Sequence, residues 1–431
     1  MHKKDYQTIN ETLYTEVLDN GLTVYLLPKA DFHKTYGLFS TDYGSIDNEF
    51  VPNGQKDFVK VPDGIAHFLE HKLFEKETGD VFQDFGKQGA SANAFTSFTK
   101  TSYLFSATTN IKENLLTLLD FVQAPYFTEA TVEKEKGIIG QEIQMYEDDP
   151  NWRQFFGIIG NLYPEHPLHI DIAGTVESIA EITAEDLYLC YNTFYHPGNM
   201  TLFVVGNIDP EEMMTWIRDN QEQKEFPAFQ PIQRKKIEEK QAIIPRSDLK
   251  MPVTRAKAVL GIKGSLKHLP ESGRELLRFK TAMDLLFQLL LGNTSQNYLH
   301  LYNDGIIDDT FDFEYNLDRS YHFADFAGDT DDPTSFFHEV QKILLGYQKD
   351  PEISQQNLSL LKKKMLGKYF QSLNSLEYIA NQFTQNLFGD TTLFDVPEII
   401  QSIELEDIYK VGAALIQKEA FSEFVIAPES E

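Results

Sequence analysis

The chain has 431 residues, enough for two or three domains, and its 42% hydrophobic and 24% charged side chains exclude a disordered or low-complexity protein. Acidic residues outnumber basic ones 66 to 38, and the net charge of −28 disfavours nucleic acid and anionic membrane surfaces as partners. The single cysteine, Cys190, excludes internal disulfides and cysteine-based metal clusters and fits a reducing compartment. Because there is neither a secretory signal pattern nor an apolar run of about 20 residues, we expect a soluble, cytoplasmic protein with no membrane partner.

The first part of the chain combines strand-like alternation with helix-like periodicity. In chain order it predicts strands at 22–27 and 35–42, a helix at 64–74, a second helix, an alternating stretch at 91–109, and helices at 112–123 and 131–147.

The region between about 220 and 254 differs in texture, because it mixes proline, glutamine and alternating charge with little apolar periodicity. We interpret it as a linker. The order of elements then repeats, with a strand at 256–264, a helix at 274–292, an alternating stretch at 308–328, and helices at 335–348 and 357–373. The sequence therefore predicts an α+β fold of two homologous domains, each a mostly antiparallel sheet packed with helices, at 1–220 and 254–431, joined by a linker at 221–253.

A short motif in the first predicted helix carries the chemistry. Residues 67–71 read His-Phe-Leu-Glu-His. Positions i and i+4 share a helix face, so His67 and His71 can bring two imidazole nitrogens to one metal ion, and Glu70 projects to the same side. This is the pattern of an inverted zinc motif. The alternative is an amphipathic helix on which three polar residues have no common role.

A second helix, at 131–147, offers two carboxylates seven residues apart on one face, Glu135 and Glu142. Its two glycines, Gly137 and Gly140, weaken a helix interior, and such positions often permit close approach of a neighbouring backbone. A helix packed closely there would deliver Glu142 as a third ligand and leave Glu135 to accept an imidazole N–H. Alone, however, a Glu- and Lys-rich helix is usually a solvated face.

Together these segments resemble the pitrilysin/insulinase family of zinc peptidases, the inverzincins, and most closely the short-chain members related to mitochondrial processing peptidase. The resemblance covers nearly the whole chain, through LDNGLTVYLLP, GIAHFLEH, GASANAFTSFTKTSY, EKEKGIIGQE, HPLHIDIAGTVESIAEITAEDL and YHPGNMTLFVVGNID. It implies one Zn²⁺ per chain held by His67, His71 and Glu142, with Glu70 as general base and Glu135 as a supporting catalytic carboxylate.

The resemblance also implies how substrate binds. The stretch from Ala90 to Tyr103 resembles the edge strand that receives a peptide backbone, with Asn93 and Ala94 near the scissile bond. Without the resemblance this stretch is only an alternating strand.

The second half departs from what a second site requires. Our alignment places Lys362 and Tyr369 opposite Glu135 and Glu142, so this half is expected to bind no zinc. The family usually places an Arg/Tyr pair for substrate in this half, but Asp304 stands where the arginine is expected.

Two explanations of the missing pair stay open. Arg319 and Tyr321 could replace it, although an exposed arginine beside a packed tyrosine is the more ordinary interpretation. Alternatively a paralogous subunit supplies the pair in a heterodimer, which we favour, with a homodimer as the second choice.

The sequence thus predicts a zinc-dependent endopeptidase that cleaves short or extended polypeptides in a two-chain chamber, as the zinc-bearing subunit. One rival is a non-catalytic structural subunit of the same fold. The complete set of His67, Glu70, His71 and Glu142 argues against it, because a scaffold has no physical need for all four. A metal-dependent hydrolase of another bond is the second rival, which the resemblance to a peptide-binding strand disfavours.

Overall fold

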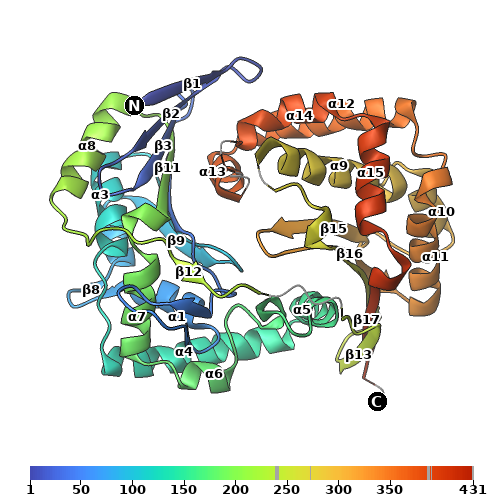
Figure 1. The fold of residues 1–431 in the computed structure, drawn as a ribbon, viewed down its shortest axis with the longest axis horizontal. Coiled ribbons are helices and arrows are strands. Elements are labelled where there is room, and N and C mark those ends of the chain that lie inside the picture. Colours follow the sequence, from blue (N-terminus) through green and yellow to red (C-terminus); the bar gives the residue numbers. More distant parts are fainter. Residues whose placement is uncertain (238–241, 272, 386–388, 390, 430–431) are drawn as a thin grey trace. The chain divides into compact units, whose positions relative to one another are not determined.

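The structure is a computed structural model that describes residues 1–237, 242–271, 273–385, 389 and 391–429 (Figure 1). It divides into two compact units, each assembled from three parts of the chain. Unit 1 comprises Met1–Gln144, Ile170–Lys236 and Ser372–Gln385, and unit 2 comprises Met145–His169, Ile237–Gln371 and Asn386–Glu431.

Unit 1 contains a seven-stranded sheet in the order β1-β2-β3-β11-β4-β10-β9. All its neighbouring strands are antiparallel except the parallel pair of β3 and β11. The central strand β4 is buried along its whole length, because both faces of the sheet are covered. The strands are β1 (His2–Tyr6), β2 (Glu11–Val17), β3 (Thr23–Pro28), β4 (Thr35–Thr41), β9 (Ala90–Thr96), β10 (Thr101–Ala107) and β11 (Met200–Gly206).

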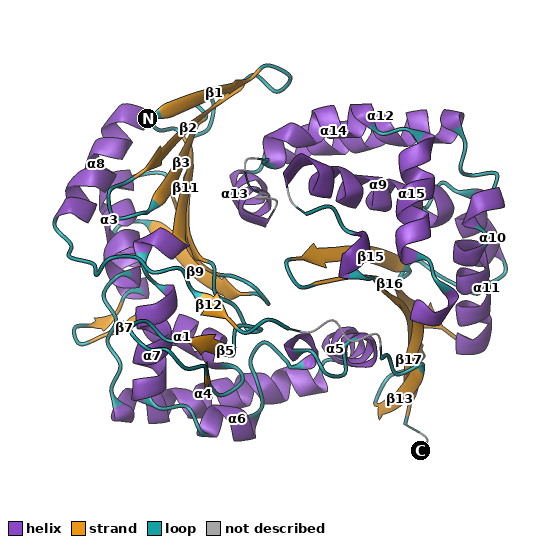
Figure 2. Ribbon diagram, viewed as in Figure 1, coloured by secondary structure: helices purple, strands orange, loops and turns teal. Residues whose placement is uncertain are grey.

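Helices and short strands surround this sheet (Figure 2). Several helices begin at a side-chain N-cap. The side chain of Thr183 accepts a backbone N–H at the start of α7, and that of Asp209 does so before Pro210 at the start of α8. The helices of unit 1 are α1 (Ile65–Leu73), α2 (Phe82–Lys87), α3 (Ile111–Val122), α4 (Glu129–Asp148, which ends in unit 2), α6 (Val176–Ala180), α7 (Ala184–Phe194), α8 (Pro210–Glu222) and α13 (Leu376–Gln385). Small sheets are formed by β5 (Glu49–Val51), β6 (Val59–Lys60) and β12 (Gln233–Arg234), and by β7 (Glu75–Lys76) and β8 (Gly79–Asp80).

Unit 2 contains a five-stranded sheet in the order β13-β17-β14-β16-β15, again with one parallel pair, β13 with β17. Its strands are β13 (Arg246–Met251), β14 (Ala256–Lys263), β15 (Asp312–Asp318), β16 (Tyr321–Thr330) and β17 (Phe421–Pro428). Its helices are α5 (Pro150–Leu162), α9 (Gly273–Leu291), α10 (Gln296–Asn303), α11 (Pro333–Leu345), α12 (Gln355–Ser372), α14 (Val396–Ser402) and α15 (Leu405–Leu415).

The two sheets follow one plan, since β3-β11-β4-β10-β9 and β13-β17-β14-β16-β15 have the same order and the same strand directions. The predicted α+β fold of two similarly built, mostly antiparallel halves is confirmed. Each sheet is also covered by a helix from the other half of the sequence. Helix α13 packs on β4 and β11, where Phe383 stacks 4.4 Å from Phe203, and α5 packs on β14 and β17.

Two details differ from the sequence-based expectations. Each alternating stretch is a hairpin and not one strand: Ser97 N–H donates to Lys100 O at 2.7 Å to turn β9 into β10, so the predicted edge strand at 90–103 ends at Thr96. Strand β13 lies inside the predicted linker, because its alternating exposure as an edge strand leaves little apolar signal. Residues 238–241 of that linker lie outside the described part of the chain.

Candidate metal centre

Helix α1 presents the His-x-x-Glu-His motif from an almost wholly buried position. Its N-cap, Gly64, has φ +87°, and a Cβ there would lie 2.4 Å from the Ala173 carbonyl oxygen, so this entry to the helix requires glycine. Phe68 and Leu69 are fully buried and anchor the helix, while His67 and Glu70 retain only 8% and 7% exposure. The motif residues are therefore fixed on a rigid element rather than on a solvated face.

Helix α4 brings Glu142 to the two histidines, as predicted. Nε2 of His67 lies 3.8 Å from one carboxylate oxygen of Glu142, and Nε2 of His71 lies 3.5 Å from the other. One ligand atom from each residue can be chosen such that all three lie within 4.8 Å of one another. Side chains that are 70 residues apart in the sequence thus form a single cluster.

The predicted reason for this close approach is wrong. A Cβ added at Gly137 or Gly140 meets no described atom within 4 Å, so these glycines do not mark a helix contact. Side chains on the other face of α4, including Ile139 and Ile143, are buried instead. Packing of these apolar groups, and not a small-residue contact, seats the helix.

The cluster fits a zinc ion by its chemistry and its spacing. Two imidazoles and one carboxylate are ligands that Zn²⁺ accepts, and tetrahedral bonds of about 2.0 Å place neighbouring donor atoms about 3.3 Å apart. The 3.5 Å and 3.8 Å separations of the Glu142 oxygens from the two Nε2 atoms are close to that value. The three residues would hold such an ion and leave a further coordination position open.

Glu135 supports the cluster from a position on α4 about two turns before Glu142. Its carboxylate lies 3.1 Å from Nδ1 of His71, and this contact directs Nε2 of the same ring toward Glu142. Burial acts to raise the pKa of Glu135, but the hydrogen bond with His71 and the charges of His71, Lys72 and Lys134 together outweigh it and lower that pKa. By contrast, Nδ1 of His67 is buried without a hydrogen-bond partner among the described residues.

The two imidazoles differ in their electrostatics. Burial and the neighbouring His71 ring, whose centroid lies 4.6 Å away, lower the pKa of His67 to about 4. Burial acts in the same direction on His71, but the hydrogen bond with Glu135 and the charges of Glu70 and Glu142 outweigh it and raise the pKa of His71. A neutral His67 is the form that binds a metal ion.

Glu70 lies beside the cluster with a raised pKa. Burial raises the pKa of its carboxyl to about 7, partly offset by a hydrogen bond from Thr96, whose Oγ1 lies 2.6 Å from Oε2. A carboxylate with a pKa near neutral pH suits proton transfer. Thr96 was not singled out from the sequence; its only signal is the alternation that places it on the same strand face as Ala94.

Lys72 is a second residue that the sequence did not bring forward. It follows His71 directly and has 0% exposure, and its Nζ binds the Glu75 carboxylate and the Thr131 carbonyl oxygen, the latter at 3.4 Å. Glu75 also lies 3.9 Å from Lys134 on α4. This cluster of Lys72, Glu75 and Lys134 ties α1 to the first turns of α4 and so fixes the helices that carry the candidate ligands.

A cavity of about 730 Å³ opens beside Glu70 and His71. Asn93 and Ala94 of β9 line it, so the structure brings the predicted substrate-contacting residues next to the candidate metal centre. The stacked rings of Phe74 and Phe82, 4.1 Å apart, form an apolar part of the lining. This volume lies within the usual range of small-molecule binding pockets.

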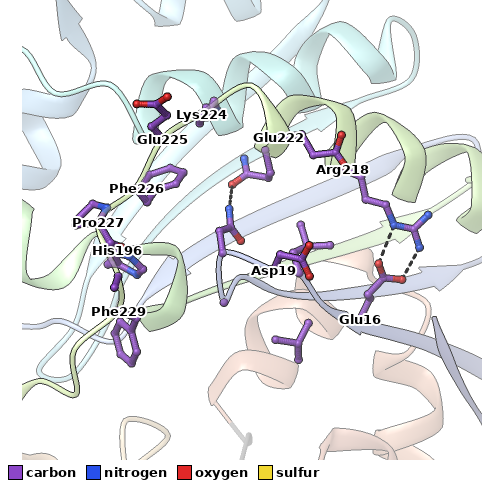
Figure 3. A pocket seen from close by; sticks show the side chains of 16 residues that line it. Glu16, Asp19, His196, Arg218, Glu222, Lys224, Glu225, Phe226, Pro227 and Phe229 are labelled. Atoms are coloured by element: carbon purple, nitrogen blue, oxygen red, sulfur yellow. Dashed lines mark hydrogen bonds and ion pairs between the residues drawn. The ribbon is translucent and has the colours of Figure 1, made fainter.

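A second cavity of unit 1, of about 780 Å³, contains none of the predicted site residues (Figure 3). Both of its cations are engaged: Arg218 binds Glu16 with two hydrogen bonds of 2.7 and 2.6 Å, and Lys224 lies 2.7 Å from Asp120. Its carboxylates at Asp19 and Glu222 are exposed to solvent. Size alone therefore does not identify the functional site.

In unit 2 the residues aligned with Glu135 and Glu142 make ordinary structural hydrogen bonds. Lys362 donates to the carbonyl oxygens of Gln401 and Ile403 at 2.6 and 2.7 Å, and the hydroxyl of buried Tyr369 donates to Leu393 O at 3.2 Å. Within the described ranges, the cluster of His67, His71 and Glu142 is the one found group of three metal-ligand side chains.

Arg319 and Tyr321, which could replace the Arg/Tyr pair, fit the more ordinary interpretation of an exposed arginine beside a packed tyrosine. Arg319 is exposed, whereas Tyr321 is buried and packs edge-on against Tyr163.

Comparison with known proteins identifies the family. Residues 60–176 match the profile described as Insulinase (Peptidase family M16), and residues 181–365 match the profile described as Peptidase M16 inactive domain. The protein named uncharacterized zinc protease YmfH of Bacillus subtilis (strain 168) is 51% identical over 427 residues, which cover 99% of each chain. The chain belongs to the insulinase, or M16, peptidase family.

Solved structures share the fold of this chain. A protein described as an M16-like peptidase from Alicyclobacillus acidocaldarius matches this M16 chain with a TM-score of 0.92 and 36% identity, over 97% of this chain and 99% of that one. A protease from Helicobacter pylori has the same fold, with a TM-score of 0.79 at 19% identity, over 96% and 99% of the two chains. No helix among the described residues of this M16 chain is long and apolar enough to cross a membrane.

Proposed function

We propose that the chain is a zinc-dependent endopeptidase that cleaves short or extended polypeptides. The observation that carries this proposal is the convergence of His67, His71 and Glu142 beside Glu70, next to a cavity lined by the edge strand β9. The name of the YmfH relative, which includes zinc protease, supports the same class of activity.

The edge of β9 is suited to bind a peptide backbone. The hydrogen-bonded pair at Ser97 and Lys100 sets the ladder, so the alternate residues Thr96 and Ala94 direct their N–H groups away from β10. The N–H of Ala94 donates instead to its neighbour Asn93 Oδ1 at 3.0 Å, a neutral partner that an incoming carbonyl can displace. An extended substrate would add to the sheet here and place one side chain in the adjoining cavity.

The chain's own groups then perform the proton transfers. A bound zinc ion would lower the pKa of water and polarise the scissile carbonyl. Glu70 accepts a proton from the attacking water and passes it to the leaving amine, for which a pKa near 7 is suitable. Glu135 holds the His71 ring in the tautomer that leaves Nε2 free to act as a ligand.

We further propose that a second, paralogous chain completes the catalytic chamber and supplies the missing Arg/Tyr pair, with a homodimer as the alternative. The support is that Asp304 stands where the family usually places the arginine of this pair. Residues 1–220 carry a net charge of −19 out of −28 for the whole chain, and this negative charge favours basic peptides as substrates. A cytoplasmic location remains a prediction, consistent with the buried thiol of Cys190.

The deciding experiment measures bound zinc and cleavage of fluorogenic peptides for the wild type, Glu142→Gln and Glu70→Gln, alone and with a paralogous chain. We expect about one zinc per wild-type chain, loss of zinc in Glu142→Gln, and retained zinc with kcat about 10²- to 10⁴-fold lower in Glu70→Gln. Glu133→Gln, on an exposed position of the same helix, is the matched control. Stoichiometric zinc without cleavage in any pairing would instead favour the structural-subunit alternative.

A further inference from the structure

Thr96 is the last residue of β9 and makes a short hydrogen bond to the candidate general base. Its Oγ1 lies 2.6 Å from Oε2 of Glu70, within the range of hydroxyl groups that donate to an ionised carboxylate. Neither the motif nor the comparisons assign a role to this residue. The contact joins the helix that carries Glu70 to the strand proposed to bind substrate.

The surrounding hydroxyl groups determine which way the Thr96 proton points. Thr101, opposite Thr96 in the ladder, has 0% exposure and donates its only hydroxyl proton to Tyr43 O at 2.9 Å. The Thr96 and Thr101 oxygens are 3.3 Å apart, so a proton between them would have to come from Thr96. The shorter, charge-assisted contact to Glu70 is stronger, and the Thr96 hydroxyl therefore donates its hydrogen bond to Oε2 while Glu70 is ionised.

This arrangement leaves the two carboxylate oxygens of Glu70 unequal. Oε2 is held by Thr96, while Oε1 has no hydrogen-bond partner among the described residues and Glu70 lines the cavity beside the metal centre. We propose that Thr96 is a positioning residue that fixes the Glu70 carboxylate, so that Oε1 takes the proton of the attacking water and returns it to the leaving amine. This inference rests on the proposed peptidase function.

The same contact couples base orientation to substrate binding. Asn93 and Ala94, which are proposed to meet the peptide backbone, lie on the strand that ends at Thr96. A peptide that adds to β9 holds that strand in place and thereby holds the hydroxyl that orients Glu70. The energetic effect of Thr96 is therefore expected on kcat and not on KM.

Three variants test this role. Thr96→Val keeps the shape of the β-branched side chain but removes the hydroxyl, and Thr96→Ser keeps the hydroxyl. Thr12→Val is the matched control, because Thr12 Oγ1 also donates to a cross-strand carboxylate, Asp5, at 2.7 Å, but does so on the β1–β2 hairpin. Each zinc-loaded protein is assayed for zinc content, kcat and KM, in the chain pairing in which the wild type is active.

We expect Thr96→Val to lower kcat about 10- to 100-fold, the worth of a hydrogen bond to a charged group, with KM and zinc content unchanged. Thr96→Ser should keep kcat within about threefold of the wild type, and Thr12→Val should match the wild type. A kcat for Thr96→Val within twofold of wild type, an equal loss in Thr96→Ser, or loss of zinc would each overturn the inference.

Failure of the proposed function can be told apart from failure of this inference. If the wild type cleaves no peptide in any pairing, the peptidase proposal fails. The role of Thr96 is then decided by crystal structures of the zinc-loaded wild type and Thr96→Val. We expect the Glu70 carboxylate to turn away from its wild-type orientation in Thr96→Val, and an unchanged orientation would overturn the inference.

Discussion

The edge strands β9 of unit 1 and β15 of unit 2 occupy equivalent positions in sheets of the same plan, yet their side chains differ sharply. Strand β9 reads ASANAFT and carries no charge, whereas β15 reads DFEYNLD and carries three carboxylates. Charged side chains protect an exposed edge from pairing with another chain, and uncharged ones leave it open. The two edges therefore differ in protection: the edge of β15 is guarded by charge and that of β9 is not.

The backbone shows the same difference at a single hydrogen bond. On β9 the outward N–H of Ala94 donates to the neutral Asn93 side chain at 3.0 Å, and on β15 that of Phe313 donates to the Asp312 carboxylate at 2.9 Å. A bond to a charged acceptor is roughly twice as strong as one to a neutral acceptor. The β15 edge is thus more firmly occupied by its own side chain.

The helices next to these sheets differ in a parallel way. Both α1 and α9 are largely buried, but α1 buries the imidazole of His67, a carboxylate and Lys72, while α9 buries mainly leucine and phenylalanine. Each buried polar group on α1 that has a partner finds it on another element: Thr131 O on α4, Thr96 on β9 and Glu75 on β7. A functional helix of this kind depends on its neighbours far more than an apolar core helix does.

The largest expected effect is on the stability of unit 1, when the buried lysine of α1 is replaced by an apolar side chain like those of α9. Lys72→Met should destabilise unit 1 by about 2–4 kcal/mol, because it leaves Glu75 without its nearest cation, and Lys134 at 3.9 Å offsets only part of this loss. Denaturant unfolding monitored in unit 1 measures the change. The double variant with Glu75→Gln should recover most of the stability, and an equal loss in both variants would show that packing of the lysine stem, not its charge, is responsible.

A smaller effect is expected from the acidic edge of unit 2. Burial, followed by the charges of Glu314 and Asp312, raises the pKa of Asp325 from 3.8 to about 7, and Glu314 is its direct partner in the ladder. Between these pH values the folded state binds more protons than the unfolded state, so the contribution of Asp325 to stability is present below pH 4 and lost as pH rises through 7.

Asp325→Asn should therefore be more stable than the wild type by about 1–3 kcal/mol at pH 8, with the difference vanishing near pH 4. Urea unfolding of both proteins between pH 4 and 8 measures this. A difference that stays constant with pH would show that the acidic edge of β15 carries no electrostatic cost.

The smallest effect is expected on KM, in a pair of variants that compare the two edge strands directly. Ala94→Pro removes one outward N–H from β9, and proline is tolerated on edge strands, so KM for peptides should rise by up to about tenfold with zinc content unchanged. Phe313→Pro, which likewise removes an outward N–H from β15, should leave KM unchanged. Equal effects of the two substitutions in steady-state assays would remove the functional distinction between the edges.

Local patterns predicted the elements well where the pattern was strong. The i, i+4 spacing of His67 and His71 located α1 to within a residue, and the repeated order of strands and helices gave the two-domain plan. Hairpins were missed because alternation continues through the turn at Ser97–Lys100. Gly137 and Gly140 were misread because a glycine in a helix has no sequence signal that separates close packing from open space.

The sequence by itself determined the family, the motif on α1 and the difference between a half with the His-x-x-Glu-His motif and a half without it, since these depend on residue types at fixed local spacing. Only the tertiary structure decided that Glu142 reaches both imidazoles, that Thr96 holds Glu70, and that Lys72 is buried against α4. It also decided that α13 covers the sheet of unit 1 and α5 that of unit 2. Such contacts join residues tens to hundreds of positions apart, and their free energy comes from burial and partner geometry that no local pattern encodes.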